Sequence, residues 1–463
     1  MKFRGLLLAL CLCGCATQPA AAPTKPIDKL FQEWDRADSP GCALAVLRDG
    51  KIAYAHGYGM ANLEHAIPIG ARTVFDIGST SKQFTATCIA LLEQDGKLGV
   101  TDDVRKYVPE LPDYGHVITL DHLLHHTSGL RDYLTLFALA GIATEDLTGD
   151  RETLAMLARQ KQTNFEPGAE WLYSNTGYFL LSVVVKRASG KTLPQFARER
   201  IFEPLGMHDT HIHDDHTLIV PHRATGYEPR EQGGFGIDMS DFEQTGDGAV
   251  MTTLEDLARW DENFYSPKVG GPALLAFLRT RGQLNDGKEL DYARGLGHGE
   301  RDGIAFESHG GAWAGYRAQL LRFPSLHTSV VCLCNLGSMD PSALCWKVAE
   351  LALAGKLHAL PPKPAPAAPN DAPKPTAGKE DFAGWPGLYA CEELGVKYAI
   401  TQSATGLSIG IPGREALPVE VLGPGKIGAQ GVELNLLHDT QGSVLGFTLD
   451  AGRVRNLRFV PVN

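Results

Sequence analysis

The stretch Phe75-Asp-Ile-Gly-Ser-Thr-Ser-Lys-Gln-Phe-Thr-Ala86 decides how this sequence is interpreted. Val74 to Ile77 form a short, mostly apolar segment, which favours a strand, and Gly78 interrupts that pattern. From Ser79 onward, apolar residues recur every three or four positions and predict a helix that ends near Asp95-Gly96. Ser79 would then open the helix, where backbone N–H groups and the helix dipole favour negative charge.

Lys82 follows Ser79 by three residues, so on a helix the two side chains lie over the same face. A serine hydroxyl is a poor nucleophile near neutral pH, and a neighbouring group has to activate it. A helix cap beside a solvated lysine would give the same tetrad, Ser79-Thr-Ser-Lys82, without any chemistry. On the tetrad alone this structural explanation is the simpler one, so the wider sequence has to decide.

Two further motifs lie C-terminal to the tetrad. Tyr173-Ser-Asn175 falls in a loop between Pro167 and Gly177, ahead of a segment with helical periodicity. His309-Gly-Gly311 precedes a strand-like segment, and its two glycines would let a substrate backbone approach closely. The chain therefore carries SxxK, YxN and HGG motifs in this order.

The three motifs resemble the signature of the penicillin-recognising serine hydrolases, and the YxN form is similar to class C β-lactamases, DD-peptidases, D-aminopeptidases and esterases. Three longer segments are similar to the same family: Leu123-Leu-His-His-Thr-Ser-Gly-Leu130, Phe165-Glu-Pro-Gly168 and His309-Gly-Gly-Ala-Trp-Ala-Gly-Tyr-Arg317. Together the matches span about residues 40–355. The resemblance implies an α+β fold, with an antiparallel sheet flanked by helices and a helical subdomain.

The resemblance also assigns catalytic roles. Ser79 would attack the acyl carbonyl of the substrate and form an acyl-enzyme. Lys82 would stay protonated or share a proton with Tyr173. Tyr173 would act as the general base and return the proton to the leaving group. Asn175 would orient Lys82 and the substrate amide.

The resemblance to this family also implies that the third motif contributes to substrate binding. The backbone N–H groups of Ser79 and Ala312, just after Gly310 and Gly311, would form the oxyanion hole. His309 takes the place of a lysine that would supply a fixed positive charge for a substrate carboxylate, whereas histidine does so only when protonated. D-aminopeptidases and some esterases with HGG need no such carboxylate.

Other side chains near the third motif are candidates for the site wall. We expect Trp313 and Tyr316 to line the site. Arg317 would supply the missing charge if it pointed inward, but a solvated arginine is the simpler expectation.

The resemblance implies a serine hydrolase acting on amide or ester bonds of small substrates, with D-amino-acid derivatives and peptidoglycan-derived peptides among the candidates. A class C-like β-lactamase or a DD-carboxypeptidase is the first alternative. A non-catalytic penicillin-binding sensor that acylates and stalls is the second, and the intact Ser79, Lys82 and Tyr173 argue against it. No cofactor is expected.

Patterning outside the motifs also indicates an α+β body. Residues 42–47 and 51–56 are β-prone and are joined by Asp49-Gly50, a strong hairpin signal. Residues 319–323 and 329–333 predict two more antiparallel strands. Helical periodicity recurs at 177–188, 254–264 and 341–354.

Length and charge restrict the remaining possibilities. A chain of 463 residues is too long for one hydrophobic core, so we expect more than one domain. The formal net charge of −11 provides no basic surface of the kind that nucleic acid requires. We therefore expect a small-molecule or peptide substrate and no nucleic-acid partner, and the oligomeric state stays open.

The N-terminal residues indicate export. Lys2 and Arg4 precede an apolar run, Leu6 to Leu12, that is too short to span a bilayer and is typical of a signal peptide. Leu12-Cys-Gly-Cys15 resembles the lipobox of bacterial lipoproteins. Residues 1–15 would then be the signal peptide and lipobox, with Cys15 lipidated on a periplasmic protein anchored to the outer membrane. Release as a soluble periplasmic or secreted protein is the alternative.

The domain boundaries follow from a change in composition. Residues 361–380 contain seven prolines among alanines and lysines, which is typical of an extended linker. This linker separates a hydrolase body, residues 27–360, from a tail of residues 381–463. The short glycine-separated runs of the tail predict a small antiparallel β-barrel. The tail resembles the lipocalin-like C-terminal domains of some family members.

Six cysteines follow Cys15, all in apolar settings. An oxidising compartment would permit disulfides between them. Cys332 and Cys334 alternate in a strand-like run, so both would face one side of a sheet, and we expect them to pack there as small hydrophobic side chains. A metal or redox role for this pair is the weaker alternative.

Other polar clusters have simpler explanations than catalysis. Glu166-Pro-Gly168 predicts a turn with a solvated glutamate. Five histidines between His208 and His222 fit no standard metal-ligand spacing, so we expect no metal site. His122, His125 and His126 share one helical turn, and packing or capping explains them.

Overall fold

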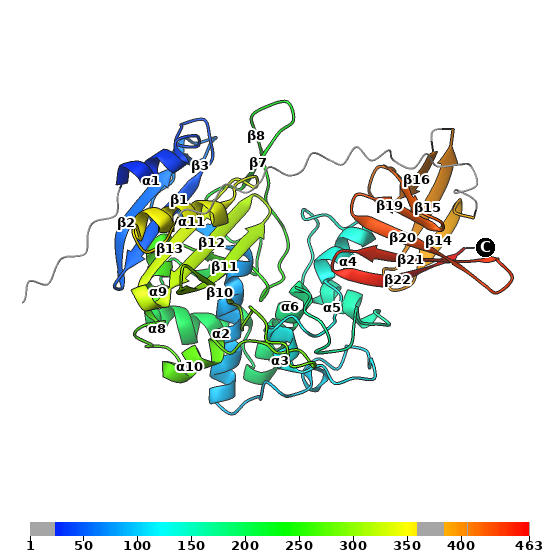
Figure 1. Cartoon of the computed structure of the whole chain (residues 1–463), viewed down its shortest axis with the longest axis horizontal. Coiled ribbons are helices and arrows are strands. Elements are labelled where there is room, and N and C mark those ends of the chain that lie inside the picture. The colour runs from blue at the N-terminus through cyan, green and yellow to red at the C-terminus, as the bar shows by residue number, and fades with distance from the viewer. Residues whose placement is uncertain (1–23, 359–383, 405, 463) are drawn as a thin grey trace, which may run out of the picture.

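The computed structural model describes residues 24–358, 384–404 and 406–462, which form an α+β body and a C-terminal β domain (Figure 1). The proposed signal peptide, Cys15 and the linker at 361–380 lie outside the described residues, so these assignments stay predictions. Within the described part of the chain, no helix combines the length and apolar character that crossing a membrane requires.

A six-stranded antiparallel sheet forms the centre of the body, in the order β10-β11-β12-β13-β1-β2. Its strands are β10 (Gly297–Arg301), β11 (Ile304–Trp313), β12 (Tyr316–Phe323), β13 (Thr328–Cys334), β1 (Cys42–Arg48) and β2 (Lys51–Tyr58). The predicted hairpin is confirmed: Asp49 and Gly50 join β1 to β2 with φ values of 49° and 71°, the left-handed backbone that a two-residue hairpin turn needs. The pairing of β12 with β13 is confirmed as well.

The central sheet is covered on both faces, and this explains why β1 and β13 are almost continuously apolar. Leu44 and Val46 belong to the core that the sheet forms with α1 (Thr24–Phe31) and α11 (Pro341–Ala352). Ala43 and Ala45 point to the opposite face, which packs against α9 (Leu254–Glu262) and the helical part of the body.

Helix α2 (Lys82–Gln94) lies at the centre of the body, where it packs against α6 and α10. Every residue from Lys82 to Leu92 is buried. The periodicity predicted a helix with one buried apolar face, whereas this helix is buried on all sides. The predicted helices correspond to α6 (Asn175–Ser189), α9 and α11. Other helices are α3 (Leu120–Leu124), α4 (Tyr133–Ala140), α5 (Asp150–Ala158), α7 (Leu193–Ala197), α8 (Glu203–Leu205) and α10 (Gly271–Leu278).

Short strands complete the body and bring the region of Ser79 against its neighbours. The predicted strand near Val74 is β5 (Phe75–Asp76), which pairs with β9 (Val250–Thr252), and β9 also pairs with β6 (His211–Ile212). Two small hairpins lie elsewhere: β3 (Met60–Asn62) with β4 (Ile67–Pro68), and β7 (Tyr227–Pro229) with β8 (Phe235–Ile237).

Two predictions about the motifs need correction. Ser79 does not open the α-helix, because it lies in a 3₁₀ turn, η1 (Gly78–Ser81), and α2 begins at Lys82. The His309-Gly-Gly311 motif precedes a strand, β12, as predicted, but the motif itself lies inside β11, which was not predicted. Sequence patterns place element boundaries poorly where glycines occur within a strand or beside a tight turn.

The C-terminal domain is a nearly closed antiparallel sheet of nine strands, in the order β17-β16-β15-β14-β22-β21-β20-β19-β18. Aromatic side chains fill its interior: the rings of Phe447 and Phe459 stack at 4.7 Å, and Tyr389 and Tyr398 each contact one of them. Its strands are β14 (Gly387–Cys391), β15 (Val396–Ser403), β16 (Gly406–Gly410), β17 (Leu417–Pro418), β18 (Glu420–Gly423), β19 (Lys426–Ala429), β20 (Val432–His438), β21 (Val444–Ala451) and β22 (Val454–Pro461).

A buried ion pair joins the C-terminal domain to the body, where β22 lies beside α4 and α5 (Figure 1). Arg131 Nη1 lies 2.6 Å from Glu393 Oε2, and the two side chains are 0% and 7% exposed. The Arg131 guanidinium also donates to the backbone carbonyls of Arg455 and Asn456. The Lys161 backbone N–H donates to the same Glu393 carboxylate, so the buried charges are well compensated.

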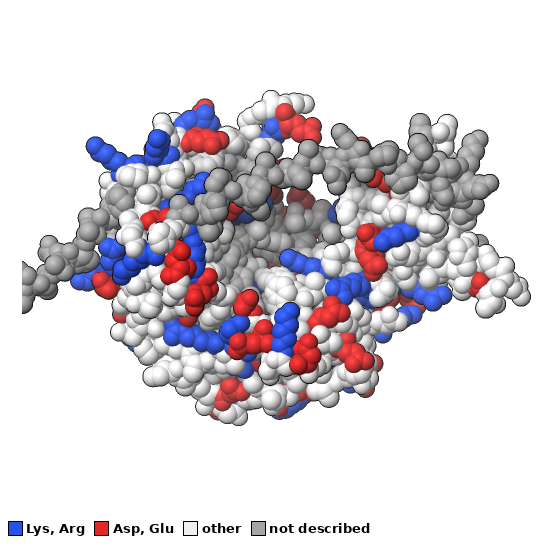
Figure 2. Space-filling model, viewed as in Figure 1, with Lys and Arg blue, Asp and Glu red and all other residues white. Residues whose placement is uncertain are grey.

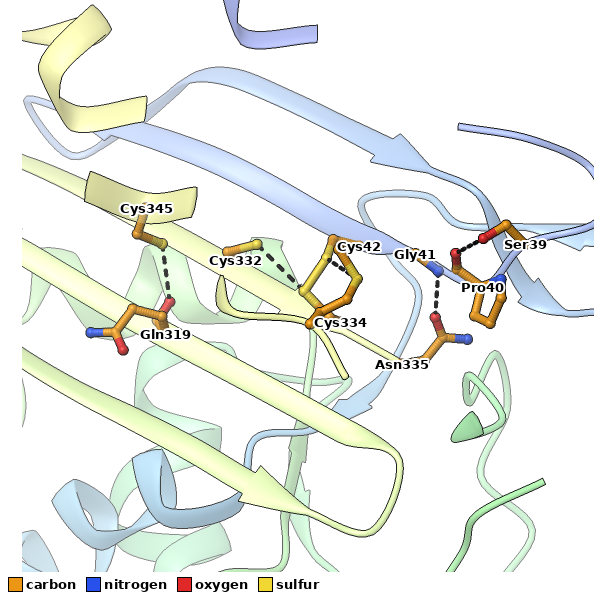
Figure 3. The surroundings of a disulfide bond; sticks show 10 residues. Ser39, Pro40, Gly41, Cys42, Gln319, Cys332, Cys334, Asn335 and Cys345 are labelled. Carbon is orange, nitrogen blue, oxygen red and sulfur yellow. Dashed lines mark hydrogen bonds between the residues drawn. A yellow bond between two sulfur atoms is a disulfide. The ribbon is translucent and has the colours of Figure 1, made fainter. Parts of the chain in front are cut away.

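Cys42 and Cys334 form a disulfide across β1 and β13 (Figure 3). The two residues are paired directly opposite each other in the sheet, which brings their sulfur atoms together. The prediction that Cys334 packs as a hydrophobic side chain is therefore wrong, whereas Cys332 is a buried free cysteine, 3.6 Å from Cys334 Sγ.

Charged side chains of both signs are interspersed over the face shown in Figure 2. This distribution agrees with the absence of a basic footprint that the net charge of −11 indicates.

Candidate active site

Ser79 is presented by a tight turn. Gly78 has a φ of 48°, a left-handed conformation that glycine adopts without steric cost, and its N–H donates to Asp76 Oδ1 at 2.7 Å. Burial raises the pKa of the Asp76 carboxyl to about 7. Ser79 lines a cavity with a volume of about 610 Å³.

Lys82 lies behind Ser79 and is fully buried. Its Nζ donates to Ser79 Oγ at 3.1 Å, to Asn175 Oδ1 at 3.1 Å and to the backbone oxygen of Asp247 at 2.5 Å. A protonated lysine has three N–H donors, so these three acceptors satisfy an ammonium group completely. The arrangement places the Lys82 amino group against the Ser79 hydroxyl, with an acceptor for each of three N–H donors.

Tyr173 faces the same cavity from the loop ahead of α6, and its ring centroid lies 4.9 Å from Lys82 Nζ. Its hydroxyl oxygen is buried and has no hydrogen-bond partner among the described residues. A buried polar atom without a partner is costly and is commonly retained for function. Tyr173 therefore brings an unengaged hydroxyl oxygen, within the described part of the chain, to the cavity that Ser79 also lines.

Asn175 is the first residue of α6, and its backbone and side chain have separate contacts. The backbone N–H donates to Asp132 Oδ2 at 2.7 Å, which satisfies one of the open donors at the helix start. The side-chain oxygen accepts from Lys82. Helix α6 therefore fixes the lysine from the side opposite Ser79.

The glycines of the third motif allow β11 to lie directly on the Ser79 turn. A Cβ atom on Gly311 would lie 1.8 Å from Ile77 O, and one on Gly78 would lie 2.7 Å from Ala312 N, so neither position tolerates a side chain. Thr80 Oγ1 donates to His309 O at 3.2 Å across the same contact. This close approach places the Ala312 and Ser79 backbones together, as an oxyanion hole requires.

His309 belongs to a chain of buried hydrogen bonds behind the cavity. His126 Nδ1 lies 3.2 Å from both the N–H and the carbonyl oxygen of Ser174, and His126 Nε2 lies 3.2 Å from Tyr292 Oη. Tyr292 O–H then donates to His309 Nε2 at 3.0 Å, and His309 Nδ1 donates to Gly310 O at 2.7 Å. For His309, one donor and one acceptor is the pattern of a neutral imidazole.

The electrostatics of the site support neutral imidazoles. Burial, together with the charge of Lys82, lowers the pKa of His309 to about 4. Burial also lowers the pKa of His126 well below its ordinary value, and Lys82 acts in the same direction. The expectation that His309 provides no fixed charge therefore agrees with its surroundings.

The structure brings the predicted site residues together around one cavity. Seven of them line it, and Lys82 contacts Ser79 from behind: the seven are Ser79, Tyr173, Asn175, His309, Gly310, Gly311 and Ala312. Trp313 and Tyr316 also line the cavity, as expected. Arg317 lines it too and is half-buried, but its Nη1 donates to the carbonyls of Ala314 and Tyr316 at 2.7 Å.

Sequence analysis missed four residues of the site. Asp247 provides the third acceptor for Lys82, and burial raises the pKa of its carboxyl to about 6. Tyr292 bridges the two histidines, and His126 had been assigned to packing or capping. Arg453 lines the cavity from the C-terminal domain. His126 lies in the quoted segment Leu123 to Leu130, whereas Asp247, Tyr292 and Arg453 lie in none of the quoted motifs and reach the site through tertiary packing.

The remaining polar clusters lie mostly apart from the catalytic residues. Glu166 is 74% exposed beside the turn at Gly168, as predicted. Asp215, His216 and Glu243 lie close enough to hold a metal ion but are partly exposed and do not line the cavity. His213, from the same histidine-rich stretch, does line the cavity, and burial lowers its pKa to about 4.

A serine hydrogen-bonded to a buried lysine, on this α+β fold, is the arrangement of a serine hydrolase of the SxxK class. The chain belongs to the Beta-lactamase family, whose model matches residues 27–354.

Relatives with curated names agree with this assignment. Penicillin-binding protein 4* of Bacillus subtilis is 30% identical over 357 residues, which cover 74% of this chain and 78% of that protein. A D-aminopeptidase of Gluconobacter oxydans is 31% identical over 301 residues, which cover 65% of this chain and 56% of that protein. The match thus spans just over half the length of that D-aminopeptidase.

Solved structures share the fold. The octameric penicillin-binding protein homologue from Pyrococcus abyssi has a TM-score of 0.65 at 20% identity, and the match covers 95% of this chain and 100% of that one. The penicillin-binding protein from Bacillus halodurans has a TM-score of 0.60 at 25% identity, over 71% of this chain and 98% of that one. The first match includes the C-terminal domain.

Proposed function

We propose that this protein hydrolyses amide or ester bonds of small substrates, D-amino-acid derivatives or peptidoglycan-derived peptides among them, through an acyl-enzyme at Ser79. The proposal rests on the hydrogen bond between Lys82 and Ser79. Beside it lies the hydroxyl oxygen of Tyr173, which has no hydrogen-bond partner among the described residues. The D-aminopeptidases and penicillin-binding protein among its relatives support this class of substrate.

Acylation uses the groups that converge on the cavity. In the reactive form Tyr173 is a phenolate beside the Lys82 ammonium, and it accepts the Ser79 hydroxyl proton as Oγ bonds to the substrate carbonyl carbon. The backbone N–H groups of Ser79 and Ala312 bind the oxygen that becomes negatively charged. The carbonyl–nitrogen or carbonyl–oxygen bond then breaks, and Tyr173 returns the proton to the departing amine or alcohol.

Deacylation repeats these steps with water. Tyr173 accepts a proton from a water molecule as the water oxygen bonds to the acyl carbon. The bond to Ser79 Oγ then breaks, Ser79 recovers a proton and the carboxylic acid product leaves. Lys82 keeps its three hydrogen bonds and holds positive charge beside the reacting oxygen throughout.

Neutral His309 favours this function over a class C-like β-lactamase or a DD-carboxypeptidase. Those activities act on substrates with a carboxylate close to the third motif, where a lysine provides a fixed charge. In this chain the corresponding imidazole is held by Tyr292 and the carbonyl of Gly310.

The nucleophile is tested with fluorophosphonate labelling and turnover. We expect Ser79→Ala to abolish labelling and to lower kcat on the order of 10³-fold or more, because no other group supplies the attacking oxygen. Ser342→Ala is the matched control, since Ser342 lines the same cavity from α11 and is outside the catalytic contacts. Labelling that persists in Ser79→Ala would show that the nucleophile is a different residue.

The substrate class is tested by profiling the purified wild-type protein. D- and L-aminoacyl amides, short-chain p-nitrophenyl esters and nitrocefin form the panel. Turnover of the amides or esters is expected. Nitrocefin hydrolysis at rates near those of a true class C enzyme would favour the β-lactamase function over the proposed one. Acylation without turnover would favour the non-catalytic penicillin-binding sensor.

We further propose that the mature protein is a lipoprotein anchored through Cys15 in the periplasm. The lipobox-like Leu12-Cys-Gly-Cys15 supports this, and the Cys42–Cys334 disulfide is typical of an oxidising compartment. Cys15→Ser should release the protein from membranes or block its processing, and fractionation with mass spectrometry of the N-terminus measures this. A mature N-terminus well beyond Cys15 would contradict the anchor.

A further inference from the structure

The turn between β21 and β22 reaches the active-site cavity from the C-terminal domain. Arg453, in this turn, lines the cavity together with Ser79, and its guanidinium carbon lies 4.7 Å from the ring centroid of Tyr173. Lys82 Nζ lies 4.9 Å from the same centroid. The ring of the proposed base therefore contacts one cation from the body and one from the C-terminal domain.

Backbone contacts hold this turn in place independently of the Arg453 side chain. The carbonyl of Arg453 accepts from Asn164 Nδ2 at 2.9 Å and from the Asp132 N–H at 3.3 Å. The Arg455 N–H donates to Asn164 Oδ1 at 2.8 Å. A substitution at Arg453 thus removes the guanidinium and leaves these hydrogen bonds intact.

The charge of Arg453 is only weakly compensated. Its one ion pair in the described part of the chain is a 3.9 Å contact with Asp132 Oδ2, and its side chain is 44% exposed. The Asp132 carboxylate already accepts from Asn175 N–H at 2.7 Å and Thr135 N–H at 3.0 Å. The Asn175 N–H shares Oδ2 with Arg453, and the 3.9 Å contact leaves much of the guanidinium available to a ligand.

Of the other positive groups near Ser79, Arg223 also lines the cavity, where its charge acts on the carboxyl of Asp76, and the others are already engaged. Lys82 donates to three acceptors, and Arg317 donates to two backbone carbonyls. His309 is neutral in its hydrogen-bond chain. Arg453 thus has the permanent charge best placed to contact a bound substrate beside Tyr173.

We propose that Arg453 binds an anionic group of the substrate, such as a carboxylate, and that the C-terminal domain thereby helps to set specificity. This inference rests on the proposed hydrolytic function and adds a substrate feature to it. A guanidinium binds a carboxylate through charge-assisted hydrogen bonds and repels an ammonium group at the same position. Substrates with a carboxylate within reach of Arg453 should therefore be preferred over neutral ones.

Two matched substrate pairs test the inference by kcat/KM. N-succinyl- and N-acetyl-D-alanine p-nitroanilide differ by a carboxylate on the acyl side. N-acetyl-D-alanine 3-carboxy-4-nitroanilide and N-acetyl-D-alanine p-nitroanilide differ by a carboxylate on the leaving group. For one pair at least, the wild type should prefer the anionic member, and Arg453→Gln should reduce that preference roughly 10-fold or more.

Variants of the same turn provide the controls. Arg455→Gln removes an equal charge, but Arg455 pairs with Glu170 at 3.0 Å and does not line the cavity, so the preference should persist. Arg453→Lys should retain part of it. Unchanged ratios in Arg453→Gln, or an equal loss in Arg455→Gln, would overturn the inference.

Failure of the proposed function gives a different result. If wild type turns over neither member of either pair, the hydrolytic proposal fails. Arg453 is then judged by the rates at which a neutral and a carboxylate-bearing phosphonate probe label Ser79. A labelling ratio that is the same in wild type and Arg453→Gln would overturn the role of Arg453 as well.

Discussion

His309 shows how one residue restricts the chemistry of this cavity. Tyr292 donates to its Nε2 atom and its Nδ1 atom donates to Gly310, so the neutral ring is already satisfied. A pKa of about 4 means that the cation accumulates only when the pH falls towards 4. Near neutral pH this position attracts a carboxylate weakly.

Replacing His309 with lysine should therefore shift the substrate preference. We expect His309→Lys to increase the rate of acylation by a penicillin relative to hydrolysis of a neutral p-nitrophenyl ester, because a charge-assisted contact contributes about 1.5–3 kcal/mol. His309→Gln, which stays neutral, should leave the ratio near the wild-type value. Stopped-flow acylation and ester hydrolysis give the two rates, and an unchanged ratio in His309→Lys would contradict the argument.

The wild-type protein should show the same shift with pH. As the pH falls towards 4, protonation of His309 should improve penicillin acylation relative to the neutral ester, and the gain should be small between pH 6 and 8. His309→Lys should lack this pH dependence. A wild-type gain centred near pH 6.5 would mean that His309 titrates as an exposed histidine does.

The site residues differ in how far sequence could predict them. Ser79 and Lys82 share one turn of chain, and the YxN and HGG motifs are short enough to recognise locally. Tyr292 and Asp247 reach the site only through tertiary packing, with no spacing rule to reveal them. Arg453 is still harder to predict, because it lies in a different domain from the nucleophile.

At the scale of elements, the contact between β11 and the 3₁₀ turn η1 organises the site. Gly311 lies so close to this turn that an added Cβ would meet Ile77 O at 1.8 Å. The backbone oxygen cannot move away without displacing Ser79. The geometry of the oxyanion hole thus depends on the absence of one methyl group.

Gly311→Ala should consequently impair catalysis more than folding. We expect kcat to fall by about 10²-fold or more, the size of effect seen when an oxyanion-hole donor is lost. The control is Gly70, where an added Cβ would meet no atom within 4 Å and φ is not positive. Gly303 is unsuitable as a control, because its φ of 74° disfavours alanine. Gly70→Ala should retain wild-type kcat, and near-normal turnover by Gly311→Ala would contradict the proposed hole.

Periodicity predicted the elements well where they are long. The hairpin at Asp49-Gly50 and the helices α6, α9 and α11 follow from turn chemistry and spacing. The start of α2 was misplaced because a 3₁₀ turn and the first turn of an α-helix share the same local pattern. Strand β11 was missed at the third motif because its glycines resemble a loop.

At the scale of the whole molecule, the buried Arg131–Glu393 pair fixes the C-terminal domain against the body. Removing one partner of such a pair leaves the other charge buried without compensation, which costs about 3–5 kcal/mol. The same pair lies beside the turn that carries Arg453, since Arg131 also donates to the carbonyl of Arg455. Docking and substrate preference should therefore change together.

Glu393→Gln should lower the free energy of unfolding and reduce the preference for anionic substrates, while neutral substrates are affected less. Glu392→Gln is the matched control, because Glu392 is 80% exposed and pairs with Lys161 at the surface. Thermal denaturation and the two substrate pairs measure both effects. A Glu393→Gln protein with unchanged stability and preference would show that the domains do not depend on this pair.

The order of strands in the central sheet could not be predicted from the sequence, and the disulfide depends on that order. Cys42 lies opposite Cys334 only because β1 inserts next to β13, a pairing between the two ends of the body. Alternation along Cys332-Leu-Cys334 correctly places both cysteines on one face but identifies no partner.

That disulfide closes the polypeptide of the body into a covalent loop, since the two cysteines are 292 residues apart. Ser79, Tyr173 and His309 all lie within this loop. A single protease cut between Cys42 and Cys334 would leave two pieces that stay joined, and the nicked enzyme would migrate as one species until a reductant is added. Resistance to proteolytic separation is thus a property of the connectivity of this chain, independent of how stable its fold is.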